Sequence, residues 1–260
     1  MAKFTIGDEA LKMLQANDEQ ANGNTGNGLE WTQLRVGESF KVRVMGTQDF
    51  IGFYSYGIFK KVNSFVAKDP CKRNAKGYPE SNLTPWDLAC DYHQKRAFEA
   101  NEKGDEATYK TERAEASLYR GKQRFGFGFI DLATGKPIVI DISKNQATSV
   151  VATINKYAKK LNKLAFELAK SGSGTKVTVT LTPFIDFEDD LTEKEQANFH
   201  KWDDKVFDPN NFEGLLYEMD NKEQIAMLKQ VGFDVSLIGL GAKEEDEFEI
   251  EELDDENVPF

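Results

Sequence analysis

Cysteine and histidine are scarce in this chain of 260 residues, with two of each. Two cysteines cannot build a disulfide framework, so we expect a reducing, cytoplasmic location. Two histidines leave no evident acid–base pair, and the sequence has no P-loop, G-x-S-x-G or Rossmann motif, so we do not expect an enzyme. No apolar run approaches the ~20 residues of a membrane span, and the N-terminus lacks the apolar stretch and cleavage site of a secretory signal.

An overall surplus of basic residues is also missing, since the net charge is −11. The charge is distributed unevenly, however: residues 243–260 contain ten acidic side chains and one lysine, whereas residues 35–185 contain 25 lysines and arginines against 15 acidic residues. A basic body can bind an anionic polymer whatever the average charge of the chain, so nucleic acid stays a candidate partner. The alternative is that these basic residues only keep a large surface soluble.

Hydrophobic residues alternate with basic ones in residues 39–45, where Phe40, Val42 and Val44 flank Lys41 and Arg43. This period of two predicts a half-buried strand with a cationic outer face. Runs rich in aromatic and β-branched residues predict four further strands. The five expected strands are residues 39–45, 50–62, 122–132, 137–142 and 176–185.

One long helix is expected between the fourth and fifth strands. Ser143 and Gln146 have capping-box spacing, apolar residues recur at three- and four-residue steps from Val150 to Leu168, and Ser171–Gly174 ends the pattern. Four strands, a helix and a fifth strand match a five-stranded OB-fold barrel. The expected class is therefore mainly β with helical additions.

The other segments are expected to surround this barrel. Asn- and Gly-rich residues 17–30 indicate a flexible arm, and repulsion among the acids of the tail indicates disorder. Helices are expected after Thr192, which has Glu195 at capping-box spacing, and from about Asn211 to Val231 with a break near Asp220. The expected parts are an N-terminal arm at 1–34, an OB-fold core at 35–242 with an inserted subdomain at 63–121 and C-terminal helices at 191–232, and an acidic tail at 243–260.

Aromatic and basic side chains share faces of the expected strands. Period two places Tyr54, Tyr56 and Lys60 on one side of the second strand. Phe53 and Phe59 lie on the opposite side. Single strands of nucleic acid are bound by cations that track phosphates and by rings that stack under bases, so the tyrosine side suits a wet platform and the phenylalanine side suits the core. Ordinary barrel packing of these aromatics is the alternative.

Phenylalanine alternates with glycine in the third strand, where Phe125, Phe127 and Phe129 share one face opposite Gly126 and Gly128. Either the rings are core and the glycines let a backbone or a base approach closely, or the rings form the binding platform. The residues expected to contact a single strand are Lys41, Arg43, Tyr54, Tyr56, Lys60, Lys61, Lys122, Arg124 and Phe127.

Two further patterns could hold metal ions. In the insertion, which is expected to contain a Pro- and Gly-containing loop and a charged helical run, Cys71, Cys90 and His93 could provide part of the four-ligand set that zinc requires. Buried free thiols and a surface histidine are the favoured interpretation, so we do not predict a zinc site or another cofactor. The acidic run Asp186–Asp190 could form a two-metal nuclease centre, but contiguous acids before a capped helix are usually a solvated helix start.

The end of the chain is similar to a known family. Ten acids followed by Asn257-Val258-Pro259-Phe260 resemble the tip of bacterial and phage single-stranded DNA-binding proteins, which end in acids, a short apolar pair and a terminal phenylalanine. An apolar ring, a free carboxylate and surrounding anions can dock in a basic pocket of a partner or in the protein's own DNA groove.

Internal segments are also similar to the single-stranded DNA-binding proteins of tailed phages. The similarity covers the stretch from Arg124 to Leu240 and includes the segments 141–146 and 233–240. The insertion with Cys71, Cys90 and His93 resembles the zinc subdomain of the T4-like members. It departs from their set of three cysteines and one histidine, which puts a zinc site in this chain in doubt.

The resemblance implies sequence-independent binding of single-stranded DNA in phage DNA replication, recombination and repair, in the cytoplasm of a bacterial host. It also implies that the tail recruits replication and recombination proteins. Two alternatives remain: an acidic DNA mimic or interaction protein, against which the basic body counts, and a metal-dependent nuclease. The tail residues expected to contact partners are Asp254, Asp255, Val258, Pro259 and Phe260.

Overall fold

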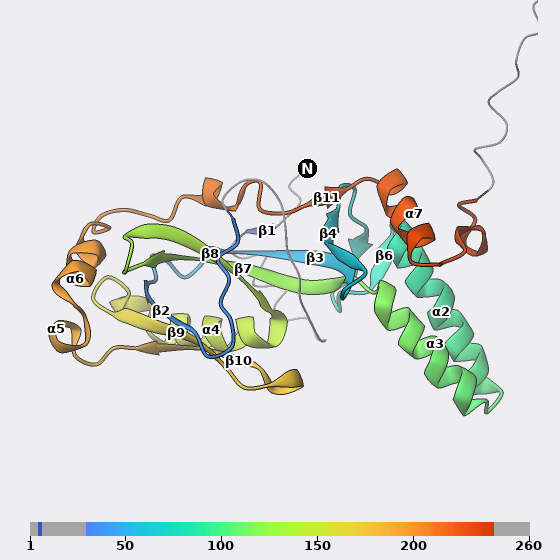
Figure 1. Ribbon diagram of the computed structural model, residues 1–260, viewed down its shortest axis with the longest axis horizontal. Coiled ribbons are helices and arrows are strands. Elements are labelled where there is room, and N and C mark those ends of the chain that lie inside the picture. The colour runs from blue at the N-terminus through green and yellow to red at the C-terminus, as the bar shows by residue number, and fades with distance from the viewer. Residues whose placement is uncertain (1–4, 7–29, 242–260) are drawn as a thin grey trace, which may run out of the picture.

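A large, mostly antiparallel sheet forms the body of this mixed α/β protein, whose computed structural model describes residues 5–6 and 30–241 (Figure 1). The strands pair in the order β10-β9-β2-β7-β3-β4-β11, while β1 pairs with β3 and β8 pairs with β7. Among the strands of this sheet within the described residues, only the β11–β4 pair is parallel. The strands of this sheet are β1 (Thr5–Ile6), β2 (Ser39–Arg43), β3 (Phe50–Ile58), β4 (Val62–Ala67), β7 (Lys122–Asp131), β8 (Lys136–Ser143), β9 (Ala165–Ser171), β10 (Thr178–Pro183) and β11 (Glu218–Met219).

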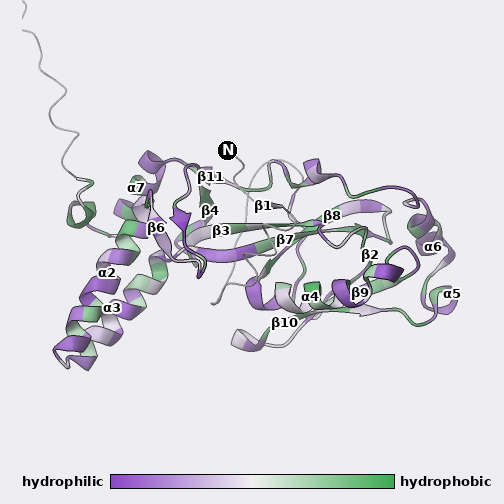
Figure 2. Ribbon diagram, turned by 180° about the vertical axis from the view of Figure 1, so that it is seen from behind, coloured by the Kyte–Doolittle hydropathy of each residue, from purple (hydrophilic) through white to green (hydrophobic). Residues whose placement is uncertain are grey.

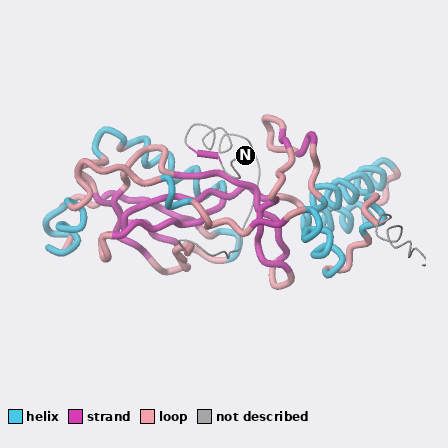
Figure 3. The backbone as a smooth tube through the Cα atoms, turned by 90° about the horizontal axis from the view of Figure 1, so that it is seen from above, coloured by secondary structure: helices cyan, strands magenta, loops and turns pink. Residues whose placement is uncertain are grey.

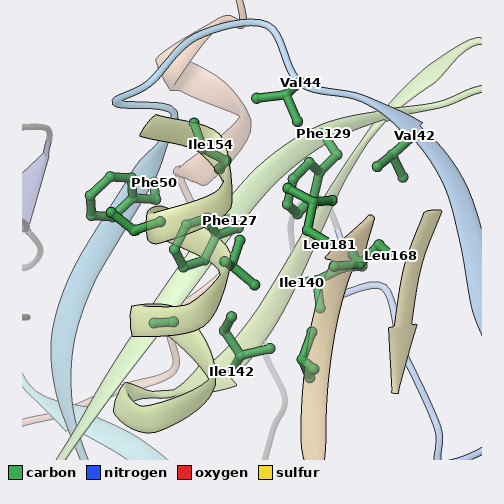
Figure 4. Close-up of a cluster of buried hydrophobic side chains, with 14 of the residues drawn as sticks. Val42, Val44, Phe50, Phe127, Phe129, Ile140, Ile142, Ile154, Leu168 and Leu181 are labelled. Atoms are coloured by element: carbon green, nitrogen blue, oxygen red, sulfur yellow. The ribbon is translucent and has the colours of Figure 1, made fainter. Parts of the chain in front are cut away.

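The main core lies between this sheet and helix α4 (Lys144–Lys156). Phe125, Phe127 and Phe129 of β7 point into it together with Val150 and Ile154 of α4, and all five side chains are buried. Figure 4 shows the helix beside Phe50 and Phe127, with Phe129 and the labelled valines, isoleucines and leucines of this core around them. The alternation in β7 thus selects the face that becomes core, as the first of the two expectations for these rings required.

The expected OB-fold barrel is not confirmed, because the described strands do not form a closed barrel. Strand β10 ends the sheet on one side and β8 pairs only with β7, and no β8–β10 ladder is present among the described residues. Helix α4 packs against β10, β7 and β8 instead. The body is therefore an open, curved sheet whose gap is covered by a helix.

The long helix expected up to Leu168 is shorter, and this part of the prediction is wrong. It begins as expected after Ser143, whose backbone N–H donates to Gln146 Oε1 at 3.0 Å, but it ends at Lys156. A 3-10 turn, η1 (Ala158–Lys160), follows, and residues from Ala165 onward form β9. Strand β9 pairs with β2 on one side and β10 on the other, so sheet hydrogen bonds on both edges outweigh the helical spacing of its apolar residues.

The second strand, expected at 50–62, is a hairpin of β3 and β4 with a turn around Lys60. Strand β4 opens the insertion, which continues with a two-stranded sheet and two helices that project from one end of the body (Figures 1 and 3). Both helices carry hydrophilic residues over much of their length (Figure 2). The remaining elements of the insertion are β5 (Lys72–Arg73), β6 (Pro79–Ser81), α2 (Pro85–Glu102) and α3 (Glu106–Tyr119).

A second core, separate from that of the body, holds the insertion. Trp86 of α2 is fully buried against Tyr56, Phe65 and Tyr119. Helix α2 begins at a capping box, in which Thr84 Oγ1 accepts from the Asp87 N–H at 3.1 Å and Pro85 occupies the first turn. The charged helical run expected here is confirmed, as two helices rather than one.

The chain after β10 runs along the length of the sheet and ends beside the insertion (Figure 1). The capping box at Thr192 and Glu195 is confirmed at the start of α6. The helix expected from Asn211 to Val231 is only partly correct, because a 3-10 turn and the short strand β11 precede its helical part. The elements of this segment are α5 (Phe187–Asp190), α6 (Glu193–His200), η3 (Pro209–Phe212), β11, α7 (Asn221–Gln230) and η4 (Val235–Ile238), and η2 (Gly174–Lys176) joins β9 to β10.

Two of the expected parts fall largely or wholly outside the described residues. The N-terminal arm at 1–34 is described at 5–6 and 30–34, where β1 pairs with β3 and Leu34 is buried. The acidic tail at 243–260 lies outside the described residues. None of the described helices is long and apolar enough to cross a membrane.

Candidate nucleic-acid interface

A pocket of about 280 Å³ lies where β3 and β7 meet the insertion. Tyr54 of β3 and Lys122 of β7 contribute from the sheet, and the hairpin of β5 and β6 contributes the opposite wall. The pocket combines aromatic rings with cations, which is the combination that binds bases and phosphates of single strands. Its aromatic and basic lining residues are Tyr54, Tyr78, Arg73, Lys76, Arg120 and Lys122.

Tyr54 is held rigidly in this pocket. Its hydroxyl accepts from Gln123 Nε2 at 2.7 Å, and the Arg73 guanidinium lies 3.9 Å from the ring centroid. Burial raises the pKa of Tyr54, which keeps the phenol neutral. Gly77 has φ +86°, and a Cβ there would lie 2.7 Å from Tyr54 Oη, so the hairpin loop can close against the ring only with glycine at this position.

Tyr56, expected beside Tyr54 on a wet platform, is buried instead, and this prediction is wrong. Its hydroxyl donates to Asp87 Oδ2 at 2.8 Å and accepts from Arg73 at 2.8 Å. Arg73 also pairs with Asp87 Oδ1 at 2.9 Å, and Thr84 donates to Asp87 Oδ2 at 2.8 Å. We call Tyr56, Arg73, Thr84 and Asp87 the polar knot. It joins β3, β5 and α2, and so fixes the insertion to the sheet.

Three cations of the pocket make no ion pair with another described residue. Lys76 and Arg120 are exposed, and Lys122 is half-buried. Burial, assisted by the charge of Arg124, lowers the pKa of Lys122. An anion in the pocket would offset both the burial of Lys122 and its repulsion by Arg124, because the anion would place a counter-charge beside the desolvated ammonium group.

The cations expected on the outer face of the body are bound by the chain's own carboxylates and carbonyls. Arg43 is buried, pairs with Asp203 at 2.7 Å and donates to the carbonyl of Phe199. Lys41 pairs with Glu195 at 3.0 Å. The chain after β10 supplies all three of these partner residues, and it covers the face that the alternation marked as solvent-exposed.

Arg124 and Phe127 of β7 are likewise unsuited to contact nucleic acid. Arg124 is buried and makes two hydrogen bonds to the carboxylate of Asp141, at 2.9 and 2.6 Å. Phe127 is 1% exposed in the main core and stacks on Phe50. Both predictions are corrected: Arg124 forms a structural ion pair with Asp141, and Phe127 belongs to the main core.

The glycines of β7 admit side chains of this chain rather than a base. A Cβ at Gly126 would lie 2.9 Å from the Trp31 ring, and one at Gly128 would lie 2.3 Å from the ring of Phe207. The glycines do allow a close approach, but the approaching groups are side chains, chiefly aromatic rings that cover this face, and not the backbone or base that was expected.

Lys60 and Lys61 are exposed, as expected, but they lie in the turn between β3 and β4 rather than within a strand. Phe59, expected in the core, is 86% exposed at the same turn, so its predicted placement is wrong. The strand ends at Ile58, and beyond that residue the alternation no longer assigns faces. Phe53, expected in the core, is buried.

Cys71, Cys90 and His93 do not come together. His93 Nδ1 lies 2.7 Å from Glu112 Oε2, and Cys90 Sγ accepts from Gln94 at 3.1 Å. Burial raises the pKa of Cys71 to about 12, so it is a protonated thiol. Among the described residues no group of three or more Cys, His, Asp or Glu side chains is placed to hold a metal ion.

The acidic run at Asp186–Asp190 forms the short helix α5. Asp186 caps it by accepting from the backbone N–H groups of Glu188 and Asp189 at 3.1 and 3.2 Å. This geometry matches the expected solvated helix start, which was the alternative to a two-metal nuclease centre. The expected partner-binding residues Asp254, Asp255, Val258, Pro259 and Phe260 lie outside the described residues.

Four pocket residues were missed in the sequence, namely Arg73, Lys76, Tyr78 and Arg120. The first three lie within seven residues of one another around Gly77, so basic residues interleaved with an aromatic ring and a turn glycine were the available signal. Arg120 directly follows α3 and precedes β7, a position that only the folded insertion brings to the pocket.

The chain matches no protein-family model, no curated protein and no solved structure.

Proposed function

We propose that this protein binds single-stranded DNA with little sequence preference, at the junction between the sheet and the insertion. The observation that carries the proposal is a pocket lined by Tyr54 and Tyr78 together with Lys76, Arg120 and Lys122, three cations that have no ion pair with another described residue. Rings offer stacking to any base, and cations offer pairing to any phosphate, so this chemistry favours single strands without reading sequence.

The order of the strands supports the proposal. We propose that β2 with β3, then β7, β8, β9 and β10, correspond to the five strands of a partly open OB fold, with α4 between the third and fourth. The insertion then lies between the first and second strands. In OB folds the loop at that position helps to bind oligonucleotides, and here the insertion supplies most of the pocket.

A titration with fluorescent oligo(dT), duplex DNA and RNA at two salt concentrations tests the proposal. We expect oligo(dT) to bind most tightly, with affinity falling as salt rises because phosphate contacts release counterions. Equal affinity for duplex and single strand would contradict it.

The Tyr78→Ala variant tests the pocket itself. Tyr78 is 50% exposed and lines the pocket, so we expect its loss to weaken oligo(dT) binding by about 1–3 kcal/mol without lowering the melting temperature. Tyr109→Ala, on α3 and outside the pocket lining, is the matched control and should bind as the wild type does. Equal binding by both variants would place the nucleic acid elsewhere.

We further propose, from the sequence of the tail, that residues 243–260 recruit replication and recombination proteins in a host cytoplasm. Ten acids within this segment can also compete with phosphates for the basic pocket. Deleting residues 243–260 should therefore raise affinity for single strands, most at low salt. Deleting Phe260 alone should leave that affinity unchanged and abolish capture of partners. Weaker DNA binding by the longer deletion would refute the competition.

A further inference from the structure

Phe59 is the most exposed aromatic side chain among the large hydrophobic residues of the described chain, at 86%. It lies at the turn between β3 and β4 and is followed by Lys60 and Lys61, which are also exposed. The Lys60 ammonium lies 5.4 Å from the centroid of the Phe59 ring. Neither lysine makes an ion pair with another described residue.

The turn is firmly held although its tip is exposed. Ile58 pairs with Val62, and the Lys61 N–H donates to the carbonyl of Ile58 at 2.9 Å. Tyr56 and Phe65, one register position further in, stack in the second core. The ring is therefore presented from a fixed hairpin, and little conformational freedom is lost when it binds.

Lys60 adopts φ +63°, the left-handed region in which glycine or asparagine is far less strained than lysine. A strained residue that keeps a charge at an exposed turn points to a role for that charge rather than for the turn. The turn thus carries one ring and two cations without a counter-charge among the described residues.

We infer that Phe59, Lys60 and Lys61 form a second contact for single-stranded nucleic acid, in which the ring stacks on a base and the lysines pair with the adjacent phosphates. This inference rests on the proposed function and extends the binding path beyond the pocket. Phe59 follows Tyr54 by five residues, so at most about 17 Å of extended backbone separates them. About five stacked nucleotides at ~3.4 Å each span that distance, which lies within the site size of an OB fold.

The test compares Phe59→Ala with Phe98→Ala. Phe98 is a second exposed phenylalanine, at 62%, on the projecting helix α2. The neighbouring cations Lys95 and Arg96 are already paired with Asp91 and Glu112, so this ring lacks cations free for phosphate. We expect Phe59→Ala to weaken oligo(dT) binding about 5- to 20-fold and Phe98→Ala less than about 2-fold, at unchanged melting temperatures.

A direct readout comes from Phe59→Trp, which keeps a stacking ring. Its fluorescence, taken as the difference from the wild type with Trp31, Trp86 and Trp202, should be quenched when oligo(dT) binds. Lys60→Gly removes the charge and the strain together, so it should weaken binding while raising the melting temperature.

The possible outcomes separate this inference from the proposed function. If Tyr78→Ala weakens binding but Phe59→Ala and Phe98→Ala bind equally, the turn is not a contact and the pocket remains. If the wild type binds no single strand, both proposals fail. If Phe59→Ala instead lowers self-association in sedimentation, the turn contacts a second copy of the chain and the inference is overturned.

Discussion

The cations on strands β2 and β7 of the body differ from three cations around the pocket and the neighbouring turn in how they are used. On the body, Arg43, Lys41 and Arg124 are each paired with a carboxylate of the same chain. At the insertion and its junction with the sheet, Lys61, Lys76 and Arg120 have no ion pair with another described residue. A cation that is already paired and buried has little to offer a phosphate, whereas an unpaired exposed cation releases counterions when it binds one.

The cause of the difference is the chain after β10. It runs along the sheet and supplies Asp203, Glu195 and the Phe199 carbonyl to the basic residues of β2 (Figure 1). It also places Phe207 over Gly128. The face that would be open in an isolated sheet is thereby covered, and the open basic surface is displaced toward the insertion.

The largest expected effect on stability comes from removing a paired cation of the body. Arg124→Ala leaves Asp141, whose side chain is 19% exposed, without its two hydrogen bonds from the guanidinium. We expect the free energy of unfolding to fall by about 3–5 kcal/mol, because breaking a buried pair leaves an uncompensated charge. Urea unfolding measures this, and the exposed Lys136→Ala on β8 should change stability by less than ~0.5 kcal/mol.

The contrast would break if Arg124→Ala kept its stability and lost affinity for single strands. In that case β7 would bind the nucleic acid through Arg124, as the sequence predicted. We expect instead that the folded variant binds oligo(dT) as the wild type does.

The polar knot predicts the next largest effect. Tyr56→Phe removes one hydroxyl that donates to Asp87 and accepts from Arg73, and leaves both of those buried groups with one partner fewer. We expect a loss of about 1–3 kcal/mol in the free energy of unfolding. Tyr109→Phe on the projecting α3 serves as control. If Tyr56→Phe kept its stability and bound oligo(dT) more weakly, Tyr56 would contact the nucleic acid, as the sequence predicted.

The fate of Tyr56 shows where sequence reasoning succeeded and where it failed. Alternation located β2, runs of aromatic and β-branched residues located β7 and β8, and the period of two in β7 identified Phe125, Phe127 and Phe129 as one face. It could not say what covers the other face, because Phe207 is separated from Gly128 by 79 positions and only folding brings them together. Local patterns therefore predicted the strands and their core side, but not which polar residues stay exposed.

The wrong prediction of a helix over the first residues of β9 has a similar explanation. Capping at Ser143 is a local signal and was correct. The apolar spacing from Tyr157 to Leu168 fits a helix and a buried strand alike, and pairing with β2 and β10 decides between them. Of the pocket residues, Tyr54 and Lys122 were predicted. Arg73, Lys76 and Tyr78 carried only the local signal around Gly77, and Arg120 is brought to the pocket only by the folded insertion.

Two carboxylates, the buried Asp87 of the insertion and the half-buried Asp49 of the body, extend this comparison. Asp87 in the knot accepts from Tyr56, Thr84 and Arg73, whereas Oδ2 of Asp49, in the body between β2 and β3, has no partner among the described residues. Burial raises the pKa of Asp49 to about 6. A raised pKa means that folding favours the protonated carboxyl group. The contribution of Asp49 to the free energy of unfolding is therefore present below pH ~4 and is lost as the pH rises through about 6.

Asp49→Asn should remove that pH dependence. We expect the free energy of unfolding at pH ~8 to rise by about 1–2 kcal/mol, a value reduced for the partial exposure of the group, with no gain at pH ~4. Urea unfolding across this pH range measures the difference between variant and wild type. A gain of equal size at both ends would mean that Asp49 does not titrate in this range.

The smallest expected effect concerns a single unpaired cation at the junction. Arg120 is exposed, lines the pocket and makes no ion pair with another described residue. If it contacts one phosphate, Arg120→Ala should lower affinity for oligo(dT) by less than about 1 kcal/mol and reduce the slope of log affinity against log salt by ~0.7. The matched control is Arg113→Ala, an exposed arginine on α3 outside the pocket lining, whose slope should equal that of the wild type. The slope decides more than the affinity does, because a general change in net charge alters both variants equally while a phosphate contact alters only one. Identical slopes for the two variants would show that the unpaired cations of the junction are solvated surface, and the contrast between body and insertion would then describe folding rather than binding.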